Sequence, residues 1–575
     1  MKESSRQPKI WKPGCEIRPS SFVRHCTYIL GAFFLLAACA DSKPSTTDSP
    51  GGTLVIATNS DPKILFPPLI ASIQARQAAE SIYDYLVAVG PEMNTFGDAG
   101  FRPRLAESWK WSPDSLSIAF KINPKARWHD GVRAGANDVR FTWQVYTNRQ
   151  LASPTAGDLG NIDSVTVADS LTAVFWYHTR SPHQLLDASQ TMILPRHVFE
   201  KIPMDSLREA GVRVDPVGTG RFRFHRWSRE SSLEITADTA NYRGRPGLNR
   251  VIWTVAPDHQ TAAAKLFGGD ADLYAGMRPD HVAELAKHAK LRLVSLPGMS
   301  YVFMGFNLRD PKAQNRPHPL FSSRELRRAL TMAVDRPSLV TNVYDTLAAV
   351  ALGPTVRAFP TTDTTLRQIP FDPRRAAAIL DSLGWVASPG EEIRKRGGKE
   401  LAFHVLVSGS SQPRMRMAVL IQEQLRRVGA RMRVSQMEIN TLRSRFEGRD
   451  FDAILWDWQF GATPNPVREM WGGEAARRKH GLNRSAYENA RFDAYVDSAI
   501  SAFKSDDAGR YFTAAYQIII DDAPAIWLYE PGTVIGLNRR IRTGAMRPDA
   551  WWLDLGSWFV PKSDQIARDR IATDR

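Results

Sequence analysis

Strand-like and helix-like segments alternate through the second half of the chain, and this alternation most constrains its fold. Leu401–Val407 is a continuous apolar run, which is typical of a strand buried on both faces. The next segment carries apolar residues three and four positions apart and stops at Gly429, which predicts an amphipathic helix. Arg431–Met437 then alternates as a strand, and Phe451–Trp456 is a further buried run. Strands that alternate with helices predict an α/β fold with a mostly parallel sheet and helices on both faces.

Two helix-start motifs, a second apolar run and the length of the chain predict further helices, an opening strand and more than one domain. Ser322-Ser-Arg-Glu325 has the form of a capping box, and Asp372-Pro373 predicts the start of a helix that ends at Leu383-Gly384. Thr53–Thr58 is a short apolar run after two glycines and predicts a buried opening strand. The 575 residues exceed what one hydrophobic core supports, so two or three domains are expected.

The segment after Trp456 is the one that sheet geometry favours for ligand binding. In open α/β sheets, ligands bind beyond the carboxyl ends of the strands, which singles out the loop Asp457–Gly461. Trp458 could form a flat apolar wall for a ligand side chain, or it could pack in the core. Asp457 could pair with a ligand cation or form a surface salt bridge.

The N-terminus has the pattern of an export signal. Thr27–Ala38 is apolar but only 12 residues long, short of the roughly 20 that span a bilayer as a helix. A basic stretch precedes it, and Leu36-Ala-Ala-Cys39 resembles the lipobox of bacterial lipoproteins, which implies a signal peptide over 1–39 and lipidation of Cys39. An ordinary cleavable signal and an uncleaved anchor are the alternatives. The composition of residues 40–50 predicts a flexible tether.

Cysteine usage and charge exclude several classes of protein. Cys15, Cys26 and Cys39 are the three cysteines, so the exported chain would hold one, with no internal disulfide and no thiol–metal cluster. The net charge of +15 is spread over the chain, without the clustered basic stripe that nucleic-acid binding needs. We therefore expect no nucleic-acid partner.

Motifs for catalysis are lacking. Trp128-His129-Asp130-Gly131 supplies no nucleophile and too few metal ligands, and we interpret it as a structural turn. No zinc-peptidase, serine-hydrolase or P-loop motif occurs. The sequence therefore predicts no catalytic residues, no metal site and no cofactor.

Eight segments, in order along the chain, resemble the family 5 extracellular solute-binding proteins, which include dipeptide and oligopeptide receptors of ABC importers. The segments are Gly51–Ala57, Leu105–Trp109, Trp128–Gly131, Ala136–Val139, Pro216–Gly220 with Phe222, Asn241-Tyr242 with Arg245-Pro246, Arg327–Arg336, and Ala523–Tyr529. Arg221 departs from the family pattern, because proline is usual at that position.

The resemblance implies a type II periplasmic-binding-protein fold, with two α/β lobes joined by two hinge strands and an extra subdomain in lobe I. Lobe I is expected over 51–300 with an insertion at 97–215, lobe II over 301–529, and the return to lobe I over 530–575. The hinges would lie near Ser300–Asn307 and Ile526–Pro531. Such proteins capture a ligand by closure of the lobes, and the closed form docks on a permease.

The chain departs from the peptide receptors of the family at the position of an acid that holds the ligand's ammonium. Gly461 stands where that acid would be, and removing a desolvated ion-pair partner typically forfeits about 2–5 kcal/mol. Either Asp457 or Asp61 substitutes for it, or the ligand has no free ammonium. The full set of predicted ligand-binding residues is Trp458, Asp457, Gln459, Phe460, Asp61, Asn307 and Tyr301.

These observations predict a monomeric substrate-binding component of an ABC-type importer that captures a peptide or similar polar solute. Its partners would be the solute and permease subunits of the inner membrane, and a lipid on Cys39 would anchor it at the periplasmic cell envelope. A ligand sensor or scaffold with the same clamp fold is the alternative function, followed by a hydrolase.

Overall fold

The computed structural model describes residues 51–570 of the protein. The predicted signal peptide, the lipidation site Cys39 and the tether lie outside the described residues. Within 51–570, no helix is both long enough and apolar enough to cross a membrane.

The first lobe is built on a seven-stranded sheet around β1 (Thr53–Thr58), all of whose residues are buried. The other strands, in spatial order, are β12 (Leu291–Leu296), β23 (Thr533–Asn538) and β11 (Leu273–Tyr274) on one side of β1, then β10 (Arg250–Val255), β9 (Ser232–Ala237) and β8 (Phe222–Ser228) on the other. β1 runs parallel to β10 and β11, and the remaining pairs are antiparallel.

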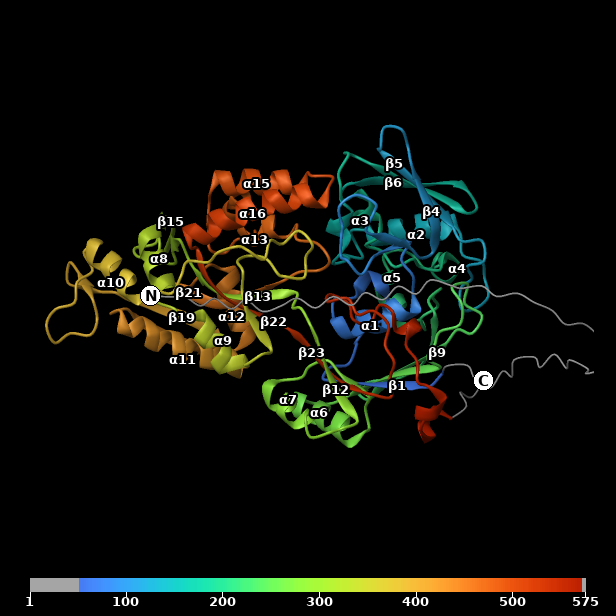
Figure 1. The fold of residues 1–575 in the computed structure, drawn as a ribbon. Helices are drawn as coiled ribbons and strands as arrows, with labels where there is room; N and C mark the ends of the chain where they lie inside the picture. Colours follow the sequence, from blue (N-terminus) through green and yellow to red (C-terminus); the bar gives the residue numbers. More distant parts are fainter. Residues whose placement is uncertain (1–50, 571–575) are drawn as a thin grey trace, which may run out of the picture. The chain divides into compact units, whose positions relative to one another are not determined.

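Helices cover both faces of this sheet, which explains why the opening strand is apolar at every position. Leu54 and Ile56 face a core that includes α1 (Ile73–Ile82). Val55 and Ala57 point the opposite way, into a core that includes side chains of α6 (His259–Gly268) and α7 (Pro279–Leu285). Figure 1 shows α6 and α7 together beside β12 at the lower edge of the drawing, apart from α1.

An additional four-stranded sheet belongs to the first lobe. Its strands, in spatial order, are β4 (Ala106–Trp111), β5 (Ser117–Ile122), β7 (Thr172–Tyr177) and β6 (Ile162–Asp169). Smaller elements around it are β2 (Val87–Val89), β3 (Phe101–Pro103), α2 (Ala136–Tyr146), η2 (Ala156–Leu159), α3 (Gln184–Ala188), α4 (Arg196–Phe199) and α5 (Leu207–Arg213). Aromatic and aliphatic side chains of these strands and of α2 form a core of their own.

The second lobe contains a six-stranded sheet. Its spatial order is β16 (Ala348–Val350), β22 (Ala525–Pro531), β13 (Ser300–Phe306), β21 (Ala453–Gln459), β19 (Ala402–Ser408) and β20 (Arg431–Met437). β19 runs parallel to β20 and β21, whereas β13 is antiparallel to both of its neighbours, β21 and β22. The prediction of a mostly parallel sheet was therefore wrong: two central strands that lead to and from the first lobe run against their neighbours.

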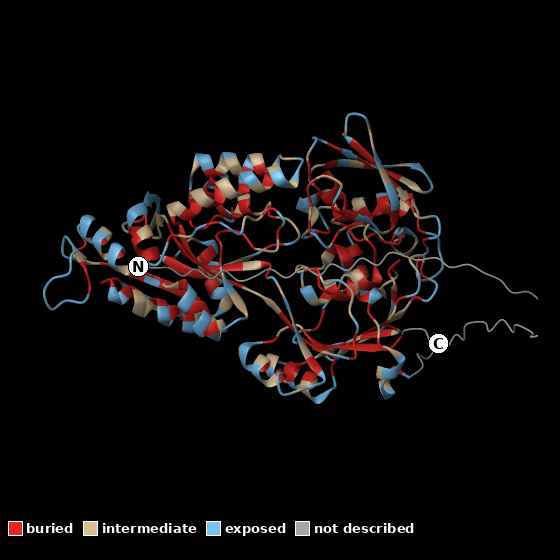
Figure 2. Cartoon of the chain, viewed as in Figure 1, coloured by how far each residue is buried: buried red, intermediate tan, exposed pale blue. Residues whose placement is uncertain are grey.

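Helices lie on both faces of the six-stranded sheet. Along β13, Met304 and Phe306 face α8 (Arg324–Met332), α9 (Arg336–Tyr344), α10 (Pro373–Ser382) and α11 (Gln412–Arg427). Tyr301 and Phe303 face α13 (Val467–Trp471), α15 (Ala490–Ile500) and α16 (Ser505–Asp522). α12 (Ile439–Glu447) and α14 (Gly473–Arg477) complete the lobe. Figure 2 shows the resulting pattern of buried strands and helices with exposed outer faces.

The start of α10 is as predicted, whereas the N-cap of α8 is Ser323, one residue after the Ser322 at which the predicted capping box would begin. The Ser323 side chain accepts a hydrogen bond from the Leu326 backbone N–H at the start of α8, and Asp372 does the same for Arg375 at the start of α10. α10 ends one residue before Leu383, as expected from Leu383-Gly384.

The chain crosses between the two sheets twice, and the two crossings lie side by side. β12 of the first lobe leads through residues 297–299 into β13, and β22 leads through Gly532 back into β23. A Cβ atom on Gly298 would lie 1.9 Å from the Pro531 carbonyl oxygen, so the glycine lets the two crossing backbones touch.

Candidate ligand-binding site

A cavity that we call the hinge cavity lies beside the two crossings and has a volume of about 320 Å³. It is lined by the carboxyl ends of β1, β11, β21 and β22. The lining residues from the first lobe include Thr58, Asn59, Arg76, His259, Tyr274, Asp549, Trp551 and Trp552, and those from the second lobe include Ser300, Gln459, Phe460 and Pro531. This is the place at which ligands bind in open α/β sheets.

A second cavity, which we call the distal cavity, has a volume of about 370 Å³. Its first-lobe lining includes Ile70, Val87, Tyr146, Asp158, Leu186, Met192 and Arg547. The second lobe contributes Gly461, Ala462, Thr463 and Pro466, from the loop that follows β21. Both cavities are thus lined by both lobes, with apolar walls and a few polar groups, as small-molecule sites usually are.

Two ion pairs form the boundary shared by the cavities. Arg76 and Asp549 each line both of them. Arg76 Nε lies 2.8 Å from Glu80, whose charge holds the pKa of Arg76 above its ordinary value. Asp549 accepts two hydrogen bonds from Arg547, at 2.5 and 2.9 Å. Each charge at the boundary is therefore neutralised by a neighbour.

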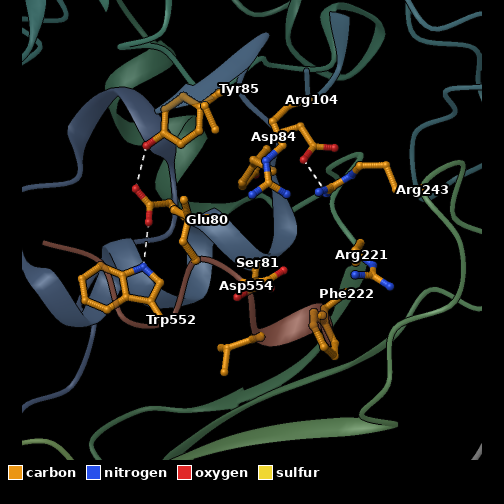
Figure 3. Close-up of a pocket in the computed structure, with 15 residues that line it drawn as sticks. Glu80, Ser81, Asp84, Tyr85, Arg104, Arg221, Phe222, Arg243, Trp552 and Asp554 are labelled. Atoms are coloured by element: carbon orange, nitrogen blue, oxygen red, sulfur yellow. Dashed lines mark hydrogen bonds and ion pairs between the residues drawn. The ribbon is translucent and has the colours of Figure 1, made fainter. Parts of the chain in front are cut away.

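Glu80 is held from three directions, two of which Figure 3 shows. In addition to Arg76, the Tyr85 hydroxyl donates to it at 2.8 Å and the Trp552 indole N–H donates at 2.6 Å. Behind Glu80 lies a small cavity of about 30 Å³, roughly the room for two water molecules.

Arginines and acids share the wall of this small cavity. Arg243 pairs with Asp84 at 2.6 Å, and Arg104 and Arg221 lie nearby (Figure 3). Burial lowers the pKa of Arg104 and of Arg221. All residues that line this cavity belong to the first lobe, so we interpret it as part of the support behind Glu80.

His259 is a polar group of the hinge cavity that the sequence analysis did not single out. Its Nδ1 lies 2.5 Å from the Tyr274 hydroxyl, and its Nε2 lies 3.3 Å from the Asn59 side-chain amide. Burial lowers the pKa of the His259 ring, which favours the neutral imidazole at pH 7. Both ring nitrogens therefore already have partners within the first lobe.

Of the predicted residues, Gln459 and Phe460 line the hinge cavity. Phe460 is buried and packs against Tyr301 and Phe359, with ring centroids 5.9 and 5.2 Å apart. The predicted loop boundary was wrong, because β21 continues through Gln459 and pairs with β13 along its whole length. Residues that were expected in a loop therefore alternate between the two faces of a strand.

Asp457 and Trp458 each contact a helix of the second lobe. Asp457 forms an ion pair of 2.5 Å with Arg414 of α11. Trp458 packs against Phe446 of α12, with ring centroids 5.8 Å apart. Neither residue belongs to the lining of the two cavities.

Asp61, Asn307 and Tyr301 are buried and hydrogen-bonded within the protein. Asp61 accepts from the Trp227 indole N–H at 2.9 Å. Asn307 donates to two backbone carbonyls of the second lobe, at 2.9 and 3.0 Å. The Tyr301 hydroxyl accepts from the Trp471 indole N–H at 2.7 Å, and burial raises the pKa of Tyr301. None of the three lines either cavity, and their binding role stays a prediction.

The lobes also meet at an edge remote from the crossings. His183 of the first lobe lies 2.9 Å through Nε2 from the Ile500 carbonyl oxygen of the second. The Arg180 guanidinium lies over the Phe503 ring, 4.7 Å from its centroid. The lobes are therefore in contact at these segments as well as at the two crossings.

Asp187 on α3, close to the distal cavity, gives a prediction about pH and stability. Burial raises the pKa of its carboxyl from 3.8 to about 7, so from pH 4 to 7 the folded protein binds a proton that the unfolded chain has released. The free energy of unfolding should therefore fall as pH rises through this window. In urea titrations, Asp187→Asn should match the wild type at pH 4 and be about 1–3 kcal/mol more stable at pH 8. Equal stabilities at pH 8 would contradict the buried, protonated carboxyl.

Comparisons with known proteins identify the family to which this chain belongs. Residues 100–477 match the family "Bacterial extracellular solute-binding proteins, family 5 Middle", and the chain belongs to this family. Its fold is the type II periplasmic-binding-protein fold, with two α/β lobes, as the resemblance of the eight segments predicted.

Individual relatives match nearly the whole chain. Oligopeptide-binding protein AppA of Bacillus subtilis (strain 168) is 27% identical over 544 residues, which cover 92% of this chain and 96% of that protein. The solved structure of AppA from Bacillus subtilis in complex with a nonapeptide superposes with a TM-score of 0.71 at 25% identity, covering 90% of this chain and 100% of that one. Heme-binding protein A of Haemophilus influenzae is 23% identical over 530 residues, 87% of this chain and 92% of that protein.

Proposed function

We propose that this protein is the substrate-binding component of an ABC-type importer and captures a peptide or similar polar solute between its lobes. The observation that carries the proposal is that two cavities are each lined by both lobes, and that one of them, the hinge cavity, lies at the carboxyl ends of strands from both sheets. The relative AppA, described as an oligopeptide-binding protein, supports a peptide as the ligand.

Capture would work by closure about the two adjacent crossings. A ligand that touches Trp551 of one lobe and Phe460 of the other gains contacts only when the lobes are together. Such a ligand binds the closed form more tightly than the open form and shifts the population toward it. A permease that docks on the closed form would then receive loaded protein in preference to empty protein.

We also propose that the protein binds its ligand without chemical turnover. His259 is the histidine of the two cavity linings, and both of its ring nitrogens have partners within the first lobe. The export pattern at the N-terminus supports a location in the periplasm, with Cys39 as the lipid anchor. We propose a monomer as the working unit.

The proposal can be tested by native mass spectrometry of the purified protein incubated with a tryptic digest of one protein. Peptides should be retained in complexes of one peptide to one protein, and should be released intact on denaturation. The proposal fails if no peptide is retained, or if the peptides are cleaved in proportion to the time of incubation.

A further inference from the structure

Three arginines of the first lobe line the small cavity behind Glu80, and we call Arg104, Arg221 and Arg243 the arginine cluster. Arg104 lies between β3 and β4, Arg221 immediately precedes β8, and Arg243 follows β9. Figure 3 shows Arg104 and Arg243 close together, with Arg221 on the same side of the cavity. Each guanidinium keeps its positive charge at pH 7, so the three groups repel one another unless negative charge lies among them.

Two carboxylates of the same cavity are already engaged by single arginines. Asp84 pairs with Arg243 at 2.6 Å. Glu80 pairs with Arg76, which is not part of the arginine cluster and does not line the small cavity. Of these two acids, only Asp84 therefore offsets a charge of the cluster.

Asp554 is the remaining carboxylate of the lining, and it forms no ion pair within residues 51–570. It accepts a hydrogen bond from the Ser557 hydroxyl at 2.6 Å. In the same part of the chain Arg104 and Arg221 also form no ion pair: Arg221 donates to the Arg245 carbonyl at 2.9 Å, and the Arg104 side chain has no hydrogen-bond partner. Even with Asp554 counted, three guanidinium groups face two carboxylates, which leaves one positive charge in excess.

Buried N–H groups of the arginine cluster also lack acceptors. The Nε atoms of Arg221 and Arg243 are buried and have no hydrogen-bond partner among the described residues, although buried donors in proteins are nearly always paired. Burial lowers the pKa of Arg104 and of Arg221, and the charges of the neighbouring arginines lower it further. A negatively charged acceptor among the three side chains would satisfy the donors and offset the repulsion together.

The size of the small cavity limits the kind of acceptor that it can hold. Its volume of about 30 Å³ is roughly the room for two water molecules, which admits a monatomic anion and excludes a peptide. Every residue of the lining belongs to the first lobe, so a site here does not require closure of the lobes.

We propose that the arginine cluster binds one small inorganic anion, of which chloride is the representative, as a structural site within the first lobe. The anion would join the segment that leads into the additional four-stranded sheet, at Arg104, to segments that flank β8 and β9 of the seven-stranded sheet. Arg221 departs from the family pattern, in which proline is usual, so the complete cluster is a feature of this chain. The proposal goes beyond the proposed function and does not depend on it.

Bromide, which scatters X-rays anomalously and resembles chloride in size and charge, locates the anion directly. Crystals of the wild-type protein soaked in bromide should show an anomalous difference peak in the small cavity, beside Arg104 and Arg221. Arg221→Pro introduces the residue that is usual at this position in the family, and should show no peak there. The absence of a peak in the wild type would overturn the proposal, and so would a peak of equal height in Arg221→Pro, which would mark an adventitious ion only.

Thermal unfolding in solution separates anion binding from a packing role of the arginines. At constant ionic strength, replacing the bulky anion isethionate by chloride should raise the unfolding temperature of the wild type by about 1–3 °C. Arg104→Gln should lose this response, and without chloride it should be at least as stable as the wild type, because an uncompensated charge is removed. Arg140→Gln is the matched control, because Arg140 is an exposed arginine of α2 outside the cavity, and it should respond as the wild type does.

Two results of the unfolding experiment would contradict the proposal. One is an equal response to chloride in the wild type and in Arg104→Gln. The other is an Arg104→Gln protein that is less stable than the wild type without chloride, since Arg104 would then act by packing. If Arg104→Gln does not fold, Arg221→Pro provides the same comparison.

Discussion

The Gly461→Trp variant is expected to lose at least 100-fold in ligand affinity while it stays folded. Gly461 lines the distal cavity, and its backbone conformation is open to residues with a side chain. A Cβ atom at this position meets nothing within 4 Å, so we expect an indole group to enter the cavity of about 370 Å³. It would compete with the ligand for the space between the lobes, which corresponds to a loss of about 3 kcal/mol or more.

Gly268→Trp is the matched control, because Gly268 is exposed at the end of α6 and also has nothing within 4 Å of a Cβ atom. Both variants should unfold within a few degrees of the wild type, as measured by circular dichroism. Affinity for peptides of the digest, measured by native mass spectrometry, should fall in Gly461→Trp alone. If the folded Gly461→Trp protein binds peptides as tightly as the wild type does, the distal cavity is not part of the ligand-binding site.

Removal of the Asp272 carboxylate should have the largest effect on stability. Asp272, the residue before strand β11, is fully buried and accepts two hydrogen bonds from Arg540, at 2.7 and 2.8 Å. It also accepts from Arg568 at 2.6 Å and from the Val55 backbone N–H at 3.0 Å. Asp272→Ala would leave a buried guanidinium with one carboxylate partner, Asp569, and should cost about 3–5 kcal/mol of unfolding free energy.

The comparison variant is Asp507→Ala, which breaks an exposed pair with Arg510 and should change the free energy of unfolding by less than about 1 kcal/mol. Adding Arg540→Leu to Asp272→Ala should recover part of the loss, because the buried charge is then removed together with its partner. A loss below 1 kcal/mol in urea denaturation of Asp272→Ala would show that this network does not hold the C-terminal segment on β1.

Local sequence patterns predicted the individual elements of the fold well. The run Leu401–Val407 corresponds to β19 (Ala402–Ser408), and the opening run Thr53–Thr58 is β1. The local patterns could not predict the direction of the strands in the sheet. β13 and β22 are apolar on both faces, as buried parallel strands are, although each runs antiparallel to its neighbours. Burial on both faces makes a strand apolar whatever its direction.

The sequence predicted only those cavity-lining residues that lie at the end of a single strand, β21. Gln459 and Phe460 were found because they end β21, and ligands bind at strand ends. Asp158 and Asp549 were missed, because they reach the cavities from segments almost 400 residues apart in the chain. Trp458 was weighed as either cavity wall or core; its contact with Phe446 depends on a strand that runs three residues further than its apolar pattern.

The measurement that tests the account most directly is small-angle X-ray scattering of ligand-free protein, before and after addition of the peptide digest. The account predicts that the radius of gyration decreases as peptide binds, and that Gly461→Trp shows no such change. A radius of gyration that stays constant while native mass spectrometry records full occupancy would contradict capture by closing lobes.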